Sequence, residues 1–439
     1  MIANPAVLFV AGFAALILAG TVALSLPLAT AAGEAVSPLT ALFTATSAVC
    51  VTGLVLVDTG TYWSGMGQAT ILVLIQLGGL GFMTSSTLLW LLLGQRLSLR
   101  QRLLLREALG GGALGELPLL VRRILAFTFL AEVAGAAVLT ARFLGEVDPG
   151  RALWWGVFHA VAAFNNAGFD VLGGFRSLTA YQHDPLVLLP IAALIVLGGI
   201  SYTVIEDLVR HRQFRRLALD SKLVLITTAT LLVVGALGLL VTEGRNPRTL
   251  GALEPGARLL NVVFHSVTPR TAGFNSLDVG QMTDEGLLLT IALMFIGGAA
   301  GSTAGGIKVQ TFSLLVLAAL ATLRGLDEVQ AFERRVRTAH VYRALTTLFL
   351  AIVLVASVSF LLSALDGHSY LPLLFETVSA FGTVGLSTGI TPELSPVAQL
   401  LLIFTMFVGR LGPLTVALAL VARERPLRYR WPEGAVRIG

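Results

Sequence analysis

The sequence predicts an all-α polytopic membrane protein, in which four pseudosymmetric helix–pore half-helix–helix units surround one central pore. Two observations support this fold class: an apolar composition and a glycine-marked segment that recurs four times. Hydrophobic residues make up 55% and charged residues 13% of the 439 residues, and the mean hydropathy is +0.84. Soluble proteins carry about 25% charged residues, so the composition excludes a soluble enzyme.

Eight segments are apolar enough for membrane-spanning helices, which need about 20 residues each. They cover roughly residues 5–27, 67–94, 122–144, 185–206, 222–242, 285–322, 342–365 and 396–422, and glycines interrupt the sixth. Four shorter apolar stretches lie between alternate pairs, at about 38–50, 152–165, 257–268 and 370–381. These are too short to span a bilayer and have the length of re-entrant half-helices.

The charge distribution predicts both the unit boundaries and the orientation. We expect pore units at residues 1–95, 96–215, 216–335 (with the interrupted second helix) and 336–422, followed by a basic tail at 423–439. The linkers and the tail hold 21 of the 30 lysines and arginines. By the positive-inside rule, the linkers and both termini are cytoplasmic in a multi-pass protein of the cell membrane. Lipid headgroups, rather than nucleic acid, are the expected contact of these charges.

A related string follows each short apolar stretch. The four strings are SAVCVTGL at 47–54, AAFNNAGF at 162–169, VTPRTAGF at 267–274 and SAFGTVGL at 379–386. A second mark lies 24–30 residues after the glycine of each string, at Gly78-Gly79, Gly198-Gly199, Gly297-Gly298 and Gly409-Arg410. We interpret the first two of these pairs as sites of close helix packing.

Four re-entrant loops from one chain can meet on a central axis. A glycine in each loop allows positive φ, which lets carbonyl groups point inward. Rings of carbonyl oxygens can replace the hydration shell of a monovalent cation. The half-helices end at the same place, and their partly negative C-termini favour a cation there.

Together with TVGLSTG at 383–389 and GGAAGSTAGGIKV at 297–309, the four strings resemble the Trk/Ktr/HKT superfamily of potassium transporters. The resemblance covers essentially the whole chain and is closest to the Ktr-type, KtrB-like membrane subunits. It implies potassium uptake through a selectivity filter and no enzymatic activity. The implied potassium-binding residues are Val51, Thr52, Gly53, Asn166, Ala167, Gly168, Thr271, Ala272, Gly273, Thr383, Val384 and Gly385. Superfamily members with serine at the first position tend to favour sodium, so Gly53 argues for potassium.

The same resemblance implies several partners. A homodimer of membrane subunits and a cytosolic KtrA-like regulatory ring that binds nucleotide are expected, as is stimulation by sodium. No cofactor is expected in this chain, because it has no nucleotide-binding motif. The glycine string of the third unit fails the Walker A pattern, since Gly306 is followed by Ile307 and then Lys308.

The second span of the third unit is the predicted gate. Each interior glycine costs a helix about 0.5–1 kcal/mol relative to alanine, so we expect a broken helix and a loop beneath the filter. The gate residues expected in this segment are Gly297, Gly298, Gly301, Ser302, Thr303, Gly305, Gly306 and Lys308. Lys308 has an alternative role, since its side chain could simply extend to the membrane surface.

Arg410 is the other gate candidate, because it lies in the middle of a span. A central arginine costs about 2.5–3.5 kcal/mol on insertion scales and marks a functional site by default. We hypothesise that Arg410 borders the cavity, hydrogen-bonds carbonyls of the gate loop and sets an electrostatic barrier. The alternative is an ion pair that only joins helices, with Glu132 as the partner.

Other polar residues give weaker signals. His159 and His265 fit no metal-ligand pattern and are expected to pack or hydrogen-bond. The acidic residues Glu34, Asp58, Asp170, Asp278 and Glu393 lie in outward-facing segments, where they concentrate cations or form a solvated face. No role is assigned to Glu376.

Two alternative functions remain open. The first is a sodium-selective or poorly selective cation channel or transporter, because three of the four strings depart from the potassium-channel motif TVGYG. The second is a coupled secondary transporter, although such proteins usually contain two inverted halves rather than four repeats in one orientation.

Overall fold

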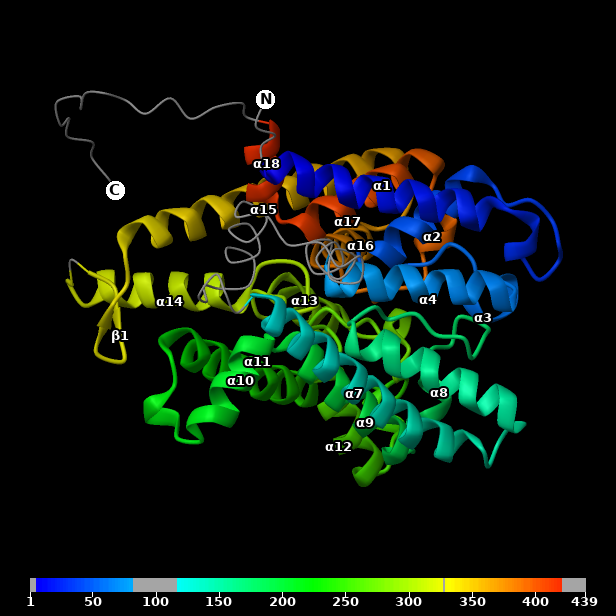
Figure 1. Cartoon of the computed structure of the whole chain (residues 1–439), viewed down its shortest axis with the longest axis horizontal. Coiled ribbons are helices and arrows are strands. Elements are labelled where there is room, and N and C mark those ends of the chain that lie inside the picture. The colour runs from blue at the N-terminus through cyan, green and yellow to red at the C-terminus, as the bar shows by residue number, and fades with distance from the viewer. Residues whose placement is uncertain (1–4, 82–116, 327, 421–439) are drawn as a thin grey trace.

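The computed structural model describes residues 5–81, 117–326 and 328–420. Helices dominate these residues, and the strands within them form a single two-stranded antiparallel hairpin of β1 (Gln330–Ala331) and β2 (Arg334–Arg335). The predicted all-α class is therefore confirmed. Figure 1 shows several long helices running along the long axis, with the hairpin, α10 and α14 at one end.

Four helix–short helix–helix units follow one another along the chain. They are α1 (Pro5–Ser25), α2 (Pro38–Val49) and α4 (Gly65–Leu80); α7 (Leu117–Phe143), α8 (Pro149–Phe164) and α9 (Pro185–Gly199); α11 (Leu219–Glu243), α12 (Pro255–Val267) and α13 (Asp284–Phe295); and α15 (Thr338–Leu365), α16 (Tyr370–Gly382) and α17 (Pro396–Leu411). The short helices α2, α8, α12 and α16 match the four predicted half-helices closely. Of the predicted unit boundaries, those near 95 and 422 lie outside the described residues.

Shorter elements connect these helices. They are α3 (Thr59–Tyr62), α10 (Tyr202–His211), α14 (Val309–Leu323) and α18 (Pro413–Leu420), with 3₁₀ turns η1 (Pro27–Ala29), η2 (Thr179–Tyr181), η3 (Phe214–Arg216), η4 (Leu250–Ala252), η5 (Val279–Gln281) and η6 (Thr391–Glu393). Proline opens the short helices α2, α8 and α12. Its fixed φ suits a first helical turn, and its missing N–H costs nothing there.

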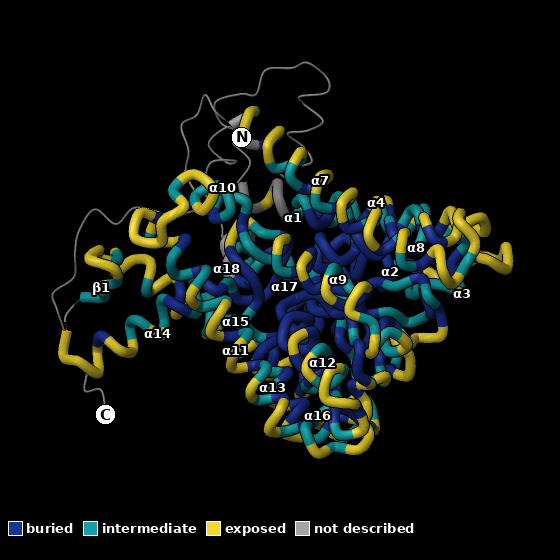
Figure 2. The backbone as a smooth tube through the Cα atoms, turned by 90° about the horizontal axis from the view of Figure 1, so that it is seen from below, coloured by how far each residue is buried: buried dark blue, intermediate teal, exposed yellow. Residues whose placement is uncertain are grey.

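The units close into a ring through one repeated contact. The second helix of each unit packs against the short helix of the next: α4 against α8, α9 against α12, α13 against α16, and α17 back against α2. The short helices therefore converge on the middle of the molecule. Figure 2 shows the buried backbone gathered at this centre and the exposed backbone at the periphery.

Two of the predicted spans need correction. Among the described residues, only three helices are long and apolar enough to cross a membrane unbroken: α7 from Val121, α11 and α15. The span predicted at 185–206 is not a single straight helix, because α9 and α10 meet at a bend of 94°. The last span is also broken, at Gly412 with φ of 85°, and the predicted end of 67–94 lies outside the described residues.

The second glycine mark is a place of close helix packing in three of the units. An added Cβ on Gly78 would lie 2.0 Å from the Val49 carbonyl oxygen. On Gly198 it would lie 1.7 Å from the Phe164 oxygen, and on Gly409 2.0 Å from that of Phe381. In these three units the second helix thus packs its glycine directly on the end of its own short helix, whereas Gly297 of the third unit packs against Gly305 of the same interrupted span.

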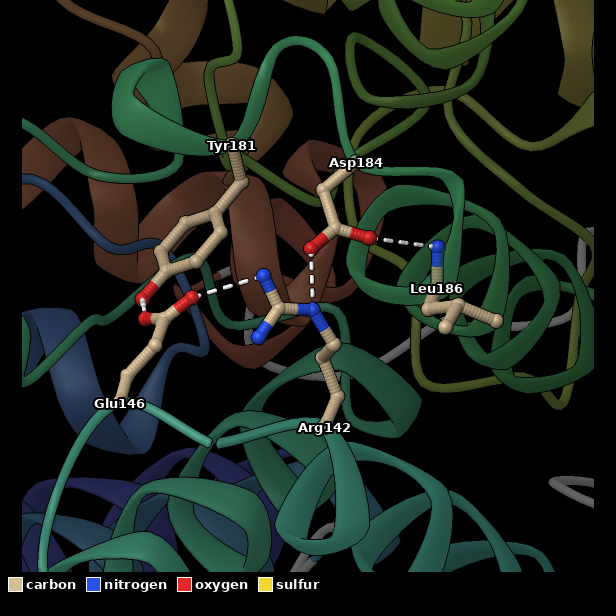
Figure 3. Close-up of polar contacts among 5 residues, drawn as sticks. All are labelled: Arg142, Glu146, Tyr181, Asp184 and Leu186. Carbon is tan, nitrogen blue, oxygen red and sulfur yellow. Dashed lines mark hydrogen bonds and ion pairs between the residues drawn. The ribbon is translucent and has the colours of Figure 1, made fainter. Parts of the chain in front are cut away.

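A polar cluster joins the ends of α7 and α9 in the second unit (Figure 3). Arg142 Nε lies 2.5 Å from Asp184 Oδ2, and its Nη2 lies 2.7 Å from Glu146 Oε1. The Tyr181 hydroxyl donates to Glu146 over 2.7 Å, and the Leu186 N–H donates to Asp184 over 2.8 Å. Asp184 therefore caps α9 while it holds the end of α7.

Candidate functional site

Four loops follow the short helices, and we call them ring loops 1 to 4: residues 50–54, 165–169, 268–274 and 383–386. Each contains two left-handed residues separated by one position. The pairs are Val51 and Gly53 (φ 55° and 91°), Asn166 and Gly168 (58° and 66°), Thr271 and Gly273 (73° and 81°), and Thr383 and Gly385 (50° and 95°). Of the four non-glycine residues, only asparagine adopts the left-handed region readily. The valine and the two threonines are strained there, so the surrounding structure must hold their backbone in place.

The four glycines interlock in a closed circle. An added Cβ on Gly53 would lie 2.4 Å from the Ala167 carbonyl oxygen in ring loop 2. The equivalent distances are 2.7 Å from Gly168 to Ala272, 2.2 Å from Gly273 to Val384, and 2.1 Å from Gly385 to Thr52. Each glycine therefore allows a carbonyl of the next loop to approach, and the fourth loop returns to the first. A side chain at any of these positions would force the ring apart.

Serines hold ring loops 1 and 4 in the same way. Ser47 Oγ accepts from the Gly53 N–H over 3.0 Å, and Ser379 Oγ accepts from the Gly385 N–H over 3.1 Å. The sequence analysis did not single out these serines. Their signal was the shared spacing of six residues between serine and glycine in SAVCVTG and SAFGTVG.

A cavity of about 330 Å³, which we call the vestibule, lies over the ring and is lined by all four glycines. Asp58, Asp170 and Asp278 also line this vestibule, whereas Glu34 and Glu393 do not. Burial raises the pKa of Asp170 to about 6, and the nearby Asp58 carboxylate adds to this effect. Burial also opposes the charge on Asp58, but hydrogen bonds from Thr61 and the loop backbone outweigh it and lower its pKa. The vestibule thus holds a persistent negative charge.

Glu376 shapes the vestibule wall, a role that sequence reasoning missed. This carboxylate on α16 is fully buried. It accepts hydrogen bonds from the Thr388 N–H (2.9 Å), the Ser387 hydroxyl (2.8 Å) and the Thr391 hydroxyl (2.7 Å). One side chain therefore holds the whole segment that follows ring loop 4.

The interrupted span forms a loop at residues 296–308, which we call the central loop. Its ends are joined by a hydrogen bond from the Gly297 N–H to the Ile307 carbonyl (2.8 Å). An added Cβ on Gly305 would lie 2.0 Å from Thr383 Oγ1, and one on Gly297 would lie 3.2 Å from the Thr271 methyl group. The central loop therefore lies directly against ring loops 3 and 4.

Arg410 reaches the central loop from α17. Its Nη1 donates to the Thr303 carbonyl, and its Nη2 donates to the Gly78 carbonyl over 2.5 Å. Glu132 bonds instead to Gln76 (3.3 Å) and Asn165 (3.0 Å), so the arginine does not pair with it. The geometry favours the loop-contact hypothesis over the ion-pair alternative.

Lys308 folds back onto the same loop. Its Nζ donates to the Ala304 carbonyl over 2.5 Å, so it does not extend to the membrane surface. Lys308 and Arg410 line a second cavity of about 200 Å³, together with Gly301, Ser302 and Thr303. Two basic side chains, one from the end of the central loop and one from α17, thus line this cavity.

The two histidines pack as expected. Both are fully buried in short helices. His159 Nδ1 lies 2.7 Å from the Trp155 carbonyl oxygen, and His265 Nε2 lies 3.5 Å from Thr290 Oγ1. Within the described residues, no group of three or more metal-ligating side chains is assembled.

Comparisons with known proteins agree with this architecture. The model of the TrkH family, described as cation transport protein, matches residues 10–426. The chain is 40% identical to the potassium/sodium uptake protein NtpJ of Enterococcus hirae, covering 99% of this chain and 97% of that protein. It is also 40% identical to the Ktr system potassium uptake protein B of Bacillus subtilis, with 98% and 95% covered.

A solved structure shares the fold. The crystal structure of the potassium transporter TrkH from Vibrio parahaemolyticus aligns with a TM-score of 0.72 at 18% sequence identity. The alignment covers 94% of this chain and 85% of that one.

Proposed function

Because the chain belongs to the TrkH family of cation transport proteins, we propose that it is the membrane subunit of a Ktr-type potassium uptake system. In this proposal, potassium crosses the cell membrane through the four ring loops. The relatives are named as uptake proteins, which fits transport rather than catalysis. Two relatives named Ktr system potassium uptake protein B match nearly the whole chain, and they support the Ktr-type assignment in particular.

The closed circle of ring loops is the observation that carries the proposal. Four carbonyl-bearing loops meet under one vestibule that holds negative charge. Such carbonyls replace the water around a dehydrated cation, and the short helices direct their partly negative ends to the same point. The twelve ring-loop residues predicted to bind potassium are the proposed filter.

The central loop is the proposed gate. It lies against ring loops 3 and 4 and is bonded to Arg410. While the central loop is in this position, the positive charge of Arg410 opposes the passage of a cation at the cavity that Arg410 and Lys308 line. Opening then requires the loop to leave both the ring and the arginine.

The assembly that we propose goes beyond a single chain. It comprises a homodimer of this subunit and a cytosolic KtrA-like ring that binds nucleotide, with sodium as a stimulating ion. The basic linkers and both termini would then face the cytoplasm, where the ring docks. No cofactor is proposed for this chain itself.

A second function has one observation in its favour. A relative with 40% identity carries a name that includes both potassium and sodium. A pore that admits sodium as well as potassium would have the same ring of four loops. The two functions differ only in the ratio of the two fluxes.

The test is cation flux into proteoliposomes that contain this subunit, with potassium, rubidium, sodium and lithium compared. The native chain is measured beside Gly385→Ser, whose Cβ would lie 2.1 Å from the Thr52 oxygen. The matched control is Gly33→Ser, since Gly33 also has positive φ (72°) but no atom within 4 Å of an added Cβ.

We expect flux that favours potassium and rubidium, a loss of this preference in Gly385→Ser, and no change in Gly33→Ser. Equal potassium and sodium flux in the native chain would favour the second function. A preference for potassium that survives Gly385→Ser would refute the proposed filter.

A further inference from the structure

Arg270 occupies an unusual place in ring loop 3, beside the start of the central loop. It is 6% exposed. Its Nη2 donates a hydrogen bond of 2.6 Å to the Gly297 carbonyl. Gly297 is the second residue of the central loop, so this single bond joins a loop of the ring directly to the segment that interrupts the third unit.

We propose that Arg270 is a positioning residue that holds the central loop against ring loop 3, so that opening the loop must break its bond to Gly297. This inference rests on the proposed function, in which the two loops are filter and gate. It assigns the coupling between them to one side chain.

The surroundings of Arg270 make the Gly297 carbonyl its essential acceptor. Within the part of the chain that the structure describes, Nε and Nη1 have no hydrogen-bond partner. The guanidinium borders a small cavity of about 20 Å³, whose described lining includes Thr228 and Leu232 but no carboxylate. A buried charge that loses its last partner is strongly destabilised. Closure of the central loop is therefore favoured by the arginine itself.

Neighbouring contacts of ring loop 3 link Arg270 to the rest of the ring. The Arg270 N–H donates to the Val267 carbonyl over 3.0 Å, which fixes the residue to the end of α12. The next residue, Thr271, has its hydroxyl 3.2 Å from the Asn166 side-chain amide. Its methyl group lies 3.2 Å from where a Cβ on Gly297 would be. A displacement of Gly297 is thus transmitted to ring loop 3, which is bonded in turn to ring loop 2.

Arg258, on the short helix α12 that precedes ring loop 3, provides a matched control. It also donates to backbone carbonyls, those of Leu250 (3.0 Å), Gly251 (3.3 Å) and Leu253 (3.1 Å). These acceptors belong to the η4 segment rather than to the central loop. Its replacement removes a carbonyl-bonded arginine without touching the proposed coupling.

The experiment uses the full-length chain in proteoliposomes with Ser302→Cys as a reporter on the central loop. Ser302 is half-buried and lines the second cavity, and the single native cysteine, Cys50, is fully buried. Two quantities are measured in Arg270→Gln, Arg270→Lys and Arg258→Gln: the rate at which a water-soluble thiol reagent labels the introduced cysteine, and the potassium-to-sodium flux ratio.

Arg270→Gln is expected to raise the labelling rate roughly tenfold, the effect of losing one charged hydrogen bond, and to lower the flux ratio. Arg270→Lys keeps a charged donor and should lie between Arg270→Gln and the native chain, while Arg258→Gln should match the native chain. A purely structural role would not change loop labelling and ion preference together.

Native labelling and a native flux ratio in folded Arg270→Gln would overturn the proposal. Failure of both Arg270 variants to fold, with Arg258→Gln folding normally, would also overturn it in favour of a role in folding alone. Absence of potassium preference in the native chain would refute the proposed function, but the labelling rates would still decide whether Arg270 holds the central loop.

Discussion

Replacing Arg410 with alanine should raise potassium flux, because the arginine holds the central loop closed. The loop receives one bond from it, at the Thr303 carbonyl. The bond to Gly78 joins Arg410 to α4 and does not involve the central loop. Only the first bond therefore contributes to the balance between closed and open loop.

The magnitude follows from that single bond. A hydrogen bond to a charged group contributes about 1.5–3 kcal/mol, and about 1.4 kcal/mol is a factor of ten in an equilibrium constant. Losing the Thr303 bond should thus shift the closed–open equilibrium by roughly 10- to 150-fold. The variant should still fold, because the insertion cost of a central arginine, about 2.5–3.5 kcal/mol, disappears with it.

The assay is the initial rate of rubidium uptake into proteoliposomes at matched protein density. The control is Arg343→Ala, which removes an exposed arginine of α15. We expect faster uptake in Arg410→Ala only. Equal uptake by folded Arg410→Ala and the native chain would refute the reasoning that the Thr303 bond restrains the loop.

Two further predictions concern the vestibule. The pKa of Asp170 is raised to about 6, so its carboxyl is charged above that pH and neutral below it; rubidium uptake should fall as the pH on the vestibule side drops from about 7 to about 5. Asp170→Asn should remove this dependence, and an unchanged pH profile in that variant would contradict the prediction. Glu376→Ala should lower the melting temperature in detergent, because the part-buried Thr388 N–H and the buried Thr391 hydroxyl lose their acceptor, at about 1–3 kcal/mol for a fully buried group. Glu376→Gln keeps one carbonyl oxygen, so its melting temperature should lie between those of Glu376→Ala and the native chain. A native melting temperature in Glu376→Ala would exclude a stabilising role.

The architecture could be predicted because it depends on patterns along the chain. Segment length separates spans from half-helices, and the recurring glycine strings show that the units are alike. The structure confirms the four short helices α2, α8, α12 and α16 and the interruption of the third unit. It also brings the four strings together at one vestibule.

The breaks in the other second spans could not be predicted from composition. Residues 185–206 are apolar throughout the part that forms α9, and hydropathy does not register a bend. Just before the bend, Gly198 packs against the Phe164 carbonyl, a contact between two helices. A hydrophobic window contains no information about that contact.

The class of protein, the four units and the residue types at the ring follow from composition, segment length and repeat spacing, which can all be counted along the chain. Which atoms come into contact depends on the three-dimensional packing of the units. Arg410 and its acceptor Gly78 are 332 positions apart. Arg270 donates to the Gly297 carbonyl, which lies in the central loop. Such contacts depend on how the units close into a ring, and ring closure is a property of the packed chain rather than of any one segment.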